Sequence, residues 1–127
     1  MGPLLRGYEM KILVCGGRDY DNYTEVREVL DGQFGRQIKT IAQGGASGAD
    51  YCAARYAKER GIELLTFRAD WKKLGRAAGP ERNKRMLSEF SPDVVVAFPG
   101  GRGTAHMKSI AVAAGVRVVE VDAWVPF

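Results

Sequence analysis

The chain alternates between short apolar runs and longer stretches in which apolar residues recur every three or four positions. The short runs predict buried strands, and they span residues 12–15, 39–43, 63–67, 94–98 and 117–121. The spacing between them predicts four helices, which begin near Asn22, Ser47, Pro80 and Thr104. Asn22 and Ser47 are typical N-cap residues. Residues 68–79 carry no regular pattern and predict an irregular connection.

This alternation of strands and helices predicts a parallel sheet with right-handed crossovers. A chain of 127 residues is long enough for one domain and too short for two independent cores. We therefore expect a single-domain, three-layer, doubly wound α/β sandwich whose five strands lie in the order 3-2-1-4-5. The segment that starts at Met10 has the pattern of a natural beginning, so we expect residues 10–127 to form the domain and residues 1–9 a tail.

Composition and cysteine usage disfavour several classes of protein. No apolar run approaches the roughly 18 residues of a membrane-spanning helix, and residues 1–9 lack the apolar core of a signal peptide. Cys15 and Cys52 lie in apolar surroundings without CxxC spacing, which predicts buried free thiols and a cytoplasmic location. A single histidine and two separated cysteines do not suit a zinc site. We expect no metal, no required cofactor and no membrane partner.

Charge is distributed unevenly along the chain. The net charge of +4 comes from 19 Lys and Arg against 15 Asp and Glu. Residues 68–85 alone contain seven basic residues against two acidic ones, while the rest of the chain is close to neutral. An anionic ligand or surface is therefore expected to meet this segment.

The connections after strands 1 to 4 are the candidate ligand-binding region. In an open α/β sheet they emerge at the carboxyl edge, where ligands bind. These connections are residues 16–22, 44–50, 68–79 and 99–104. Every glycine pair of the chain falls in one of them, and glycine lets a backbone approach a ligand closely.

Two of these connections lead directly into helices, so their backbone N–H groups and the helix dipoles can bind a phosphate or carboxylate. The first contains Gly44, Gly45, Ser47 and Gly48. The second contains Pro99, Gly100, Gly101, Arg102, Gly103 and Thr104. Neither has the Lys-Ser/Thr ending of a Walker A loop or the spacing of GxGxxG, so an NTPase or a dinucleotide dehydrogenase is not the first choice. The alternative is that these glycines only make tight turns.

Cationic side chains in the same connections are further candidates. Arg18 and Arg102 lie within glycine runs, where phosphate contact and plain solvation are both open. Arg82 and Asn83 are expected to begin a helix that faces the same edge. A cation at a helix start opposes the helix dipole, which favours an anionic ligand for Arg82.

Acidic and aromatic residues complete the candidate site, together with Gly16 and Gly17. The acidic candidates for hydrogen bonds to a ribose or base are Asp19, Asp50 and Asp70. Asp50 suits a helix cap equally well. Trp71 is either a stacking surface for a base or a core plug that anchors the long connection. His106 is expected to be structural or exposed rather than catalytic.

Three of these stretches resemble motifs of the SLOG superfamily, a Rossmann-like group that contains the LOG phosphoribohydrolases and the DNA-processing A proteins. Residues 99–104, Pro-Gly-Gly-Arg-Gly-Thr, resemble the PGGxGT loop of the phosphoribohydrolases. Residues 44–50 resemble the glycine-rich second loop of both branches, and residues 79–86 resemble their Arg-Asn or Arg-Lys segment. With residues 15–20 and 69–71 included, the chain resembles the YspA-type SLOG family in particular.

The resemblance implies a nucleotide-type ligand, such as a nucleoside monophosphate, ADP-ribose or an NAD-like molecule, bound by a sensor or processing protein. LOG enzymes hydrolyse the N-glycosidic bond of nucleoside 5′-monophosphates and hold the phosphate on the PGGxGT loop. Arg82 matches their catalytic arginine, but Met107 stands where they have a glutamate. A methionine can neither transfer a proton nor stabilise an oxocarbenium-like centre. Hydrolysis would then need Asp19, Asp50 or Asp70. The resemblance also implies a homodimer.

Two other functions stay open at this point. A single-stranded nucleic-acid-binding module, like the DNA-processing branch, would use residues 68–85 along a phosphate backbone and Trp71 against a base. A degenerate scaffold would bind nothing tightly.

Overall fold

Five parallel strands form the central sheet in the computed structural model, which describes residues 9–122. The strands are β1 (Met10–Cys15), β2 (Ile38–Gln43), β3 (Glu63–Thr66), β4 (Val94–Ala97) and β5 (Arg117–Glu120). They lie in the order β3-β2-β1-β4-β5, and every neighbouring pair is parallel. The predicted doubly wound sheet and its strand order are confirmed. Residues 1–8 of the expected tail lie outside the described residues.

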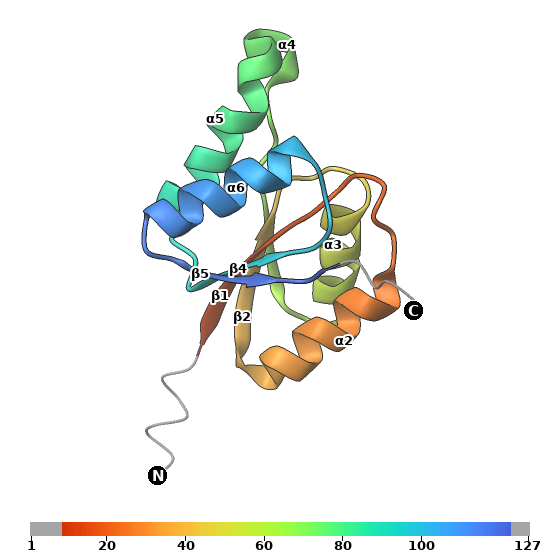
Figure 1. The fold of residues 1–127 in the computed structure, drawn as a ribbon. Coiled ribbons are helices and arrows are strands. Elements are labelled where there is room, and N and C mark those ends of the chain that lie inside the picture. Colours follow the sequence, from red (N-terminus) through yellow and green to blue (C-terminus); the bar gives the residue numbers. More distant parts are fainter. Residues whose placement is uncertain (1–8, 123–127) are drawn as a thin grey trace.

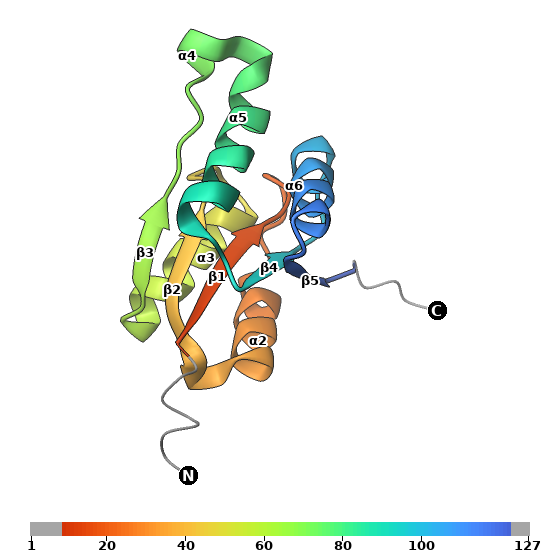
Figure 2. The same ribbon diagram turned by 90° about the vertical axis from the view of Figure 1, so that its left-hand side faces the viewer.

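Helices cover both faces of this sheet, α2 and α3 on one side and α5 and α6 on the other (Figures 1 and 2). The helices are α2 (Tyr23–Gln33), α3 (Ala49–Arg60), α4 (Trp71–Leu74), α5 (Ala78–Arg85) and α6 (Arg102–Ala113). Shorter turns are the 3-10 segments Gly35–Gln37 and Gly75–Ala77 and the π segment Met86–Phe90. Within residues 9–122, every helix is too short or too polar to span a bilayer.

Each face of the sheet has its own apolar core because successive side chains of a strand point to opposite faces. Ile12 and Val14 of β1 belong to the core beneath α2 and α3, whereas Leu13 and Cys15 belong to the core beneath α5 and α6. The side chains of residues 12–14 are fully buried, as expected of a central strand covered on both faces.

The first helix begins as predicted. The Asn22 side chain accepts a hydrogen bond from the backbone N–H of Glu25 at 3.1 Å, which satisfies one of the free donors at the start of α2. The next predicted cap is wrong, because the N-cap of α3 is Gly48 and not Ser47. The Ser47 hydroxyl instead donates to the backbone carbonyl of Arg18 at 3.1 Å, and this contact joins two loops.

Residues 68–79, predicted to be irregular, contain more structure than expected. They include α4 and a 3-10 turn, and α5 begins at Ala78, so Pro80 lies in its first turn as predicted. Arg82 and Asn83 lie in the second turn of α5 rather than at its start. In Figure 1, α4 and the first part of α5 project beyond the carboxyl edge of the sheet.

Both cysteines are buried free thiols, as predicted. Burial is the main cause that raises the pKa of Cys15, to about 12, and that raises the pKa of Cys52. Neither thiol is therefore poised for reaction.

Candidate functional site

The loops after β1, β2 and β4 are joined by hydrogen bonds at the carboxyl edge of the sheet. The Gly17 N–H donates to the Pro99 carbonyl at 2.8 Å, and the Ala49 N–H donates to the Gly17 carbonyl at 3.1 Å. The loops after β1 and β4, next to which a ligand would be expected in such a sheet, are thus joined by a backbone hydrogen bond.

Two glycines allow this close packing. A Cβ atom at Gly48 would lie 2.2 Å from the Gly17 carbonyl oxygen, and Gly48 has a φ of +75°. A Cβ atom at Gly100 would lie 2.3 Å from the Thr104 hydroxyl and 2.7 Å from the Gly17 nitrogen. Gly48 and Gly100 belong to the two loops predicted to bind an anion. In the structure their lack of a side chain lets these loops pack against the β1 loop.

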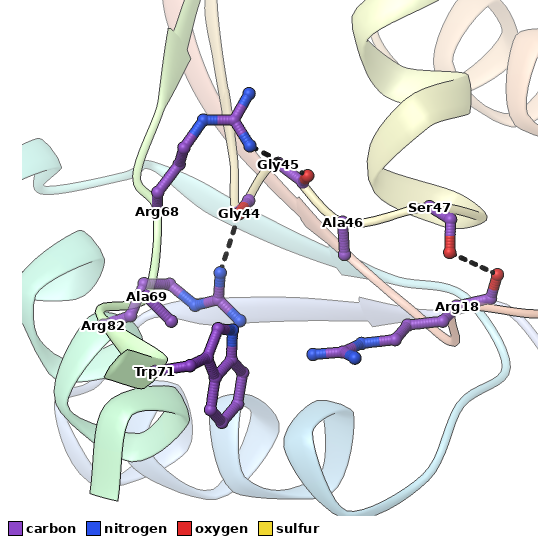
Figure 3. A pocket seen from close by; sticks show the side chains of 9 residues that line it. All are labelled: Arg18, Gly44, Gly45, Ala46, Ser47, Arg68, Ala69, Trp71 and Arg82. Carbon is purple, nitrogen blue, oxygen red and sulfur yellow. Dashed lines mark hydrogen bonds between the residues drawn. The ribbon is translucent and has the colours of Figure 1, made fainter. Parts of the chain in front are cut away.

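A cavity of about 240 Å³ lies beside these joined loops, at the carboxyl ends of β2 and β3 (Figure 3). Its lining residues come from the loops after β1, β2 and β3 and from α4 and α5. The lining residues are Arg18, Gly44, Gly45, Ala46, Ser47, Arg68, Ala69, Trp71 and Arg82. Three arginines, one from each of three segments, line the cavity, and none of its lining residues is acidic.

Arg82 connects α5 to the two neighbouring loops. Its Nη1 donates to the Gly44 carbonyl at 2.8 Å and to the Phe67 carbonyl at 3.2 Å, and its Nε donates to the Asn83 side-chain oxygen at 3.2 Å. Burial is the main cause that lowers the pKa of Arg82, and the negative charge of Asp50 opposes it. Its guanidinium therefore positions the glycine loop and lines the cavity as well.

Arg18 reaches toward the cavity from the β1 loop. Its guanidinium extends toward Trp71 and Arg82 in Figure 3 and lies 5.4 Å from the centre of the Trp71 ring. In the described part of the chain, the Arg18 guanidinium has no hydrogen bond or ion pair. This charge is free to meet a ligand.

Trp71 is not a core plug, because 48% of its surface is exposed. One edge of its ring lies against Gly79 of α5, where an added Cβ would come within 3.2 Å. The rest of the ring lines the cavity, which leaves a flat aromatic surface beside the arginines.

Arg68 is a lining residue that sequence reasoning did not single out. Its Nη1 donates to the Gly45 carbonyl at 3.3 Å, and its own carbonyl accepts from Arg85 at 2.9 Å. The sequence signal was available, because Arg68 lies two residues after β3, at the edge where the other loops meet.

The predicted carboxylates do not line the cavity. Asp50 is buried and accepts a hydrogen bond from the Ala46 N–H at 3.2 Å, which holds the glycine loop. Burial raises its pKa, while the Ala46 N–H and the charge of Arg82 oppose the shift. Asp70 accepts from the Lys73 N–H at 3.1 Å and caps α4. Asp19 is exposed.

The remaining candidates join α5 to α6 or lie outside the cavity. The buried Asn83 side chain donates to the Gly103 carbonyl at 3.1 Å and lies 3.1 Å from Nδ1 of His106. This contact agrees with the structural role expected for His106. Met107 is fully buried in the core, and Arg102 is exposed at the start of α6. The loop of residues 99–104 does not line the cavity.

Residues 9–122 contain no group of three His, Cys, Asp or Glu side chains that could hold a metal ion.

The fold and these loops define a class, a Rossmann-like α/β protein with glycine-rich loops at the carboxyl edge of its sheet. Residues 10–74, half of the chain, match the YspA, cpYpsA-related SLOG family, and the protein belongs to that family. The predicted family is therefore confirmed. A search of the curated proteins finds no match.

Two solved structures share the fold. Glycinamide ribonucleotide transformylase 1 from Symbiobacterium toebii matches 90% of this chain over 51% of its own, with 18% identity and a TM-score of 0.52. DNA processing protein A (DprA) from Streptococcus pneumoniae matches 91% of this chain over 59% of its own, with 18% identity and a TM-score of 0.51. The chain thus spans only half to three fifths of these proteins.

Proposed function

We propose that the protein binds a nucleotide or nucleotide derivative in the cavity at the carboxyl ends of β2 and β3. The observation that carries this proposal is the set of three arginines, Arg18, Arg68 and Arg82, around a cavity without a lining carboxylate. Guanidinium groups are the side chains best matched to phosphate oxygens. The exposed ring of Trp71 beside them is suited to stacking on a base.

Binding without hydrolysis is the function that these residues support best. The acidic candidates are engaged elsewhere, since Asp50 holds the glycine loop and Asp70 caps α4. Met107 occupies the glutamate position and is fully buried. In the described cavity a ligand would thus meet guanidinium groups, the Ser47 side chain and apolar groups, but no carboxylate or imidazole that could act as a general acid or base. Release of free base from AMP at an enzymatic rate would contradict this part of the proposal.

Removing the Arg18 side chain tests the site. We expect Arg18→Ala to weaken nucleotide binding at least tenfold, because a charge-assisted hydrogen bond contributes about 1.5–3 kcal/mol. Calorimetric titration with AMP, ADP-ribose, NAD, GMP and CMP would measure this effect.

Arg27→Ala is the matched control for that variant. Arg27 is an exposed arginine on α2 with no ion pair in the described part of the chain, so its loss lowers the net charge equally. Equal affinity of the Arg18 and Arg27 variants would contradict the proposed site. A third variant, Arg102→Ala, would lower nucleotide affinity if the loop of residues 99–104 also binds phosphate.

A second candidate function, the binding of single-stranded nucleic acid, is favoured by α4 and the first part of α5, which together form a projecting arm (Figure 1). Lys72, Lys73 and Arg76 are exposed next to Trp71, so a phosphate backbone and a stacked base could be bound together.

Salt dependence separates this candidate from the first. If the arm binds nucleic acid, the double variant Lys72→Ala/Lys73→Ala should lose affinity for a short single-stranded oligonucleotide. The steepness with which the logarithm of the association constant falls with the logarithm of the salt concentration should also decrease by about 1–2. The double variant Lys39→Ala/Lys58→Ala removes two exposed lysines elsewhere and serves as the control. Fluorescence anisotropy at several salt concentrations measures both. Unchanged affinity in the arm variant would exclude this candidate.

A further inference from the structure

We infer that the ligand places two negative charges between Arg18 and Arg82, as a phosphomonoester or a diphosphate, and that the cavity discriminates against monoanionic phosphodiesters. This inference rests on the proposed function, because it concerns the same cavity, and it names the chemical class of the group bound there.

The first argument is the unbalanced repulsion between two guanidinium groups. Arg18 and Arg82 both line the cavity, with no acidic residue among the other lining residues. In Figure 3 the Arg18 guanidinium extends toward Arg82, and its charge adds to the burial that lowers the pKa of Arg82. An anion between them would remove that repulsion and gain two charge-assisted contacts.

The second argument is the number of charges around the cavity. Three arginines, Arg18, Arg68 and Arg82, line the cavity, whereas the two carboxylates beside it, Asp50 and Asp70, do not line it. The neighbouring Arg85 is already paired with Glu81 at 3.2 Å. The lining of the cavity is therefore positively charged, and the Arg18 side chain extends toward Arg82 (Figure 3). A dianion neutralises the guanidinium groups of Arg18 and Arg82 together, whereas a phosphodiester leaves one of the two unneutralised in a partly buried place.

The third argument is the number of donors that remain. On Arg82, Nη1 and Nε are bound to Gly44, Phe67 and Asn83. The described part of the chain has no partner for Nη2 of Arg82 or for any nitrogen of the Arg18 guanidinium. These free N–H donors approach the cavity from two directions. They therefore suit a phosphoryl group with three unsubstituted oxygens better than a phosphodiester, in which two oxygens carry ester bonds.

A charge series tests the inference. Calorimetric titrations at pH 7.5 would compare adenosine, 3′,5′-cyclic AMP, AMP, ADP-ribose and inorganic pyrophosphate, with the guanine compounds run in parallel. We expect a dianionic nucleotide, AMP or ADP-ribose, to bind at least tenfold more tightly than cyclic AMP. Tighter binding of AMP than of ADP-ribose would then indicate a phosphomonoester site, and tighter binding of ADP-ribose would indicate a diphosphate site.

Lowering the pH checks that charge causes the preference. The second ionisation of a phosphomonoester has a pKa of about 6, so AMP should bind several-fold more weakly at pH 5.5 than at pH 7.5. The diphosphate of ADP-ribose keeps both charges and controls for titration of the protein. The charged groups around the cavity are Arg18, Arg68, Arg82, Arg85, Asp50 and Asp70. A parallel loss for both ligands would overturn the role of ligand charge.

The Arg18→Gln variant separates charge from hydrogen bonding, since glutamine keeps a donor and loses the charge. We expect it to reduce the preference for AMP over cyclic AMP to less than about threefold, while the Arg27→Gln control keeps the full preference.

The outcomes separate failure of this inference from failure of the proposed function. Cyclic AMP binding within twofold of AMP would overturn the inference and leave nucleotide binding intact. Binding of pyrophosphate without binding of any nucleotide would support the dianion site and overturn the proposed function. Binding of none of these compounds would overturn both.

Discussion

Gly48 determines where the charge of Arg18 lies. Its backbone touches Gly17 and Arg18, and a Cβ atom at position 48 would lie 2.5 Å from the carbonyl carbon and oxygen of Arg18. Any side chain there would displace the β1 loop and with it the guanidinium. The electrostatics of the cavity therefore depend on a residue that carries no side chain.

Substitution of this glycine should destabilise the fold. We expect Gly48→Ala to lower the free energy of unfolding by about 1–3 kcal/mol from its backbone conformation alone, with the clash adding to this loss. Urea denaturation followed by circular dichroism measures the change.

Gly32→Ala provides the comparison. Gly32 lies in α2 with open space around it, so alanine there should stabilise the helix by up to about 1 kcal/mol. If both variants unfold at the same urea concentration, the packing described for Gly48 is wrong.

Local contacts were predictable at the scale of single residues and long-range contacts were not. The Asn22 cap spans three residues, so the sequence pattern contains all of it. The Ser47 hydroxyl bonds to the carbonyl of Arg18, 29 residues away, and the helix begins after Gly48, which has a positive φ. No pattern around Ser47 indicates that partner.

Among the elements, α2 and α3 are joined by a polar contact at the edge of their shared core. Asp31 of α2 accepts a hydrogen bond from the Tyr56 hydroxyl of α3 at 2.6 Å and pairs with Arg60 at 2.6 Å. The contacts with Arg60 and then Tyr56 lower the pKa of Asp31. Because the Tyr56 ring is buried and Asp31 is half exposed, the contact is only partly screened by water.

The stabilisation from this contact should depend on pH. A carboxyl group whose pKa is lower in the folded state stabilises the fold above its unfolded pKa and loses that effect as the pH falls through the folded value. We expect Asp31→Asn to cost about 0.5–1 kcal/mol at pH 7, and the difference from the parent protein to shrink as the pH falls below about 4. Chemical denaturation at a series of pH values measures it.

The control is Glu28→Gln, on the exposed surface of the same helix, which should leave the pH profile unchanged. A destabilisation by Asp31→Asn that persists undiminished at low pH would show that the charge of Asp31 contributes nothing.

The elements themselves were predictable where they were long and periodic. The five apolar runs and the four longer helices all form. Burial favours the three central strands and the four helices, whereas the edge strands β3 and β5 contain no fully buried residue and form by pairing with β2 and β4. The exception is α4, whose four residues are too few to show a helical period. It forms because Asp70 caps it and because Trp71 lies against α5.

For the whole molecule, the strand order followed from rules of chain connection, but the position of the cavity did not. The topology predicts a ligand next to the point between β1 and β4, where a backbone hydrogen bond between Gly17 and Pro99 joins the two loops. The cavity lies instead at the carboxyl ends of β2 and β3, lined by residues such as Arg68. How tightly two glycine loops pack against each other is a three-dimensional property that their sequences do not reveal.

The burial of both native thiols makes the protein well suited to site-selective labelling at an introduced cysteine. Cys15 and Cys52 have raised pKa values and almost no exposed surface, so maleimide reagents would leave them unmodified in the folded state. Val112 is 67% exposed on α6, which does not line the cavity. A Val112→Cys variant would therefore carry a single fluorophore or surface tether, and ligand binding could be followed with the cavity unobstructed.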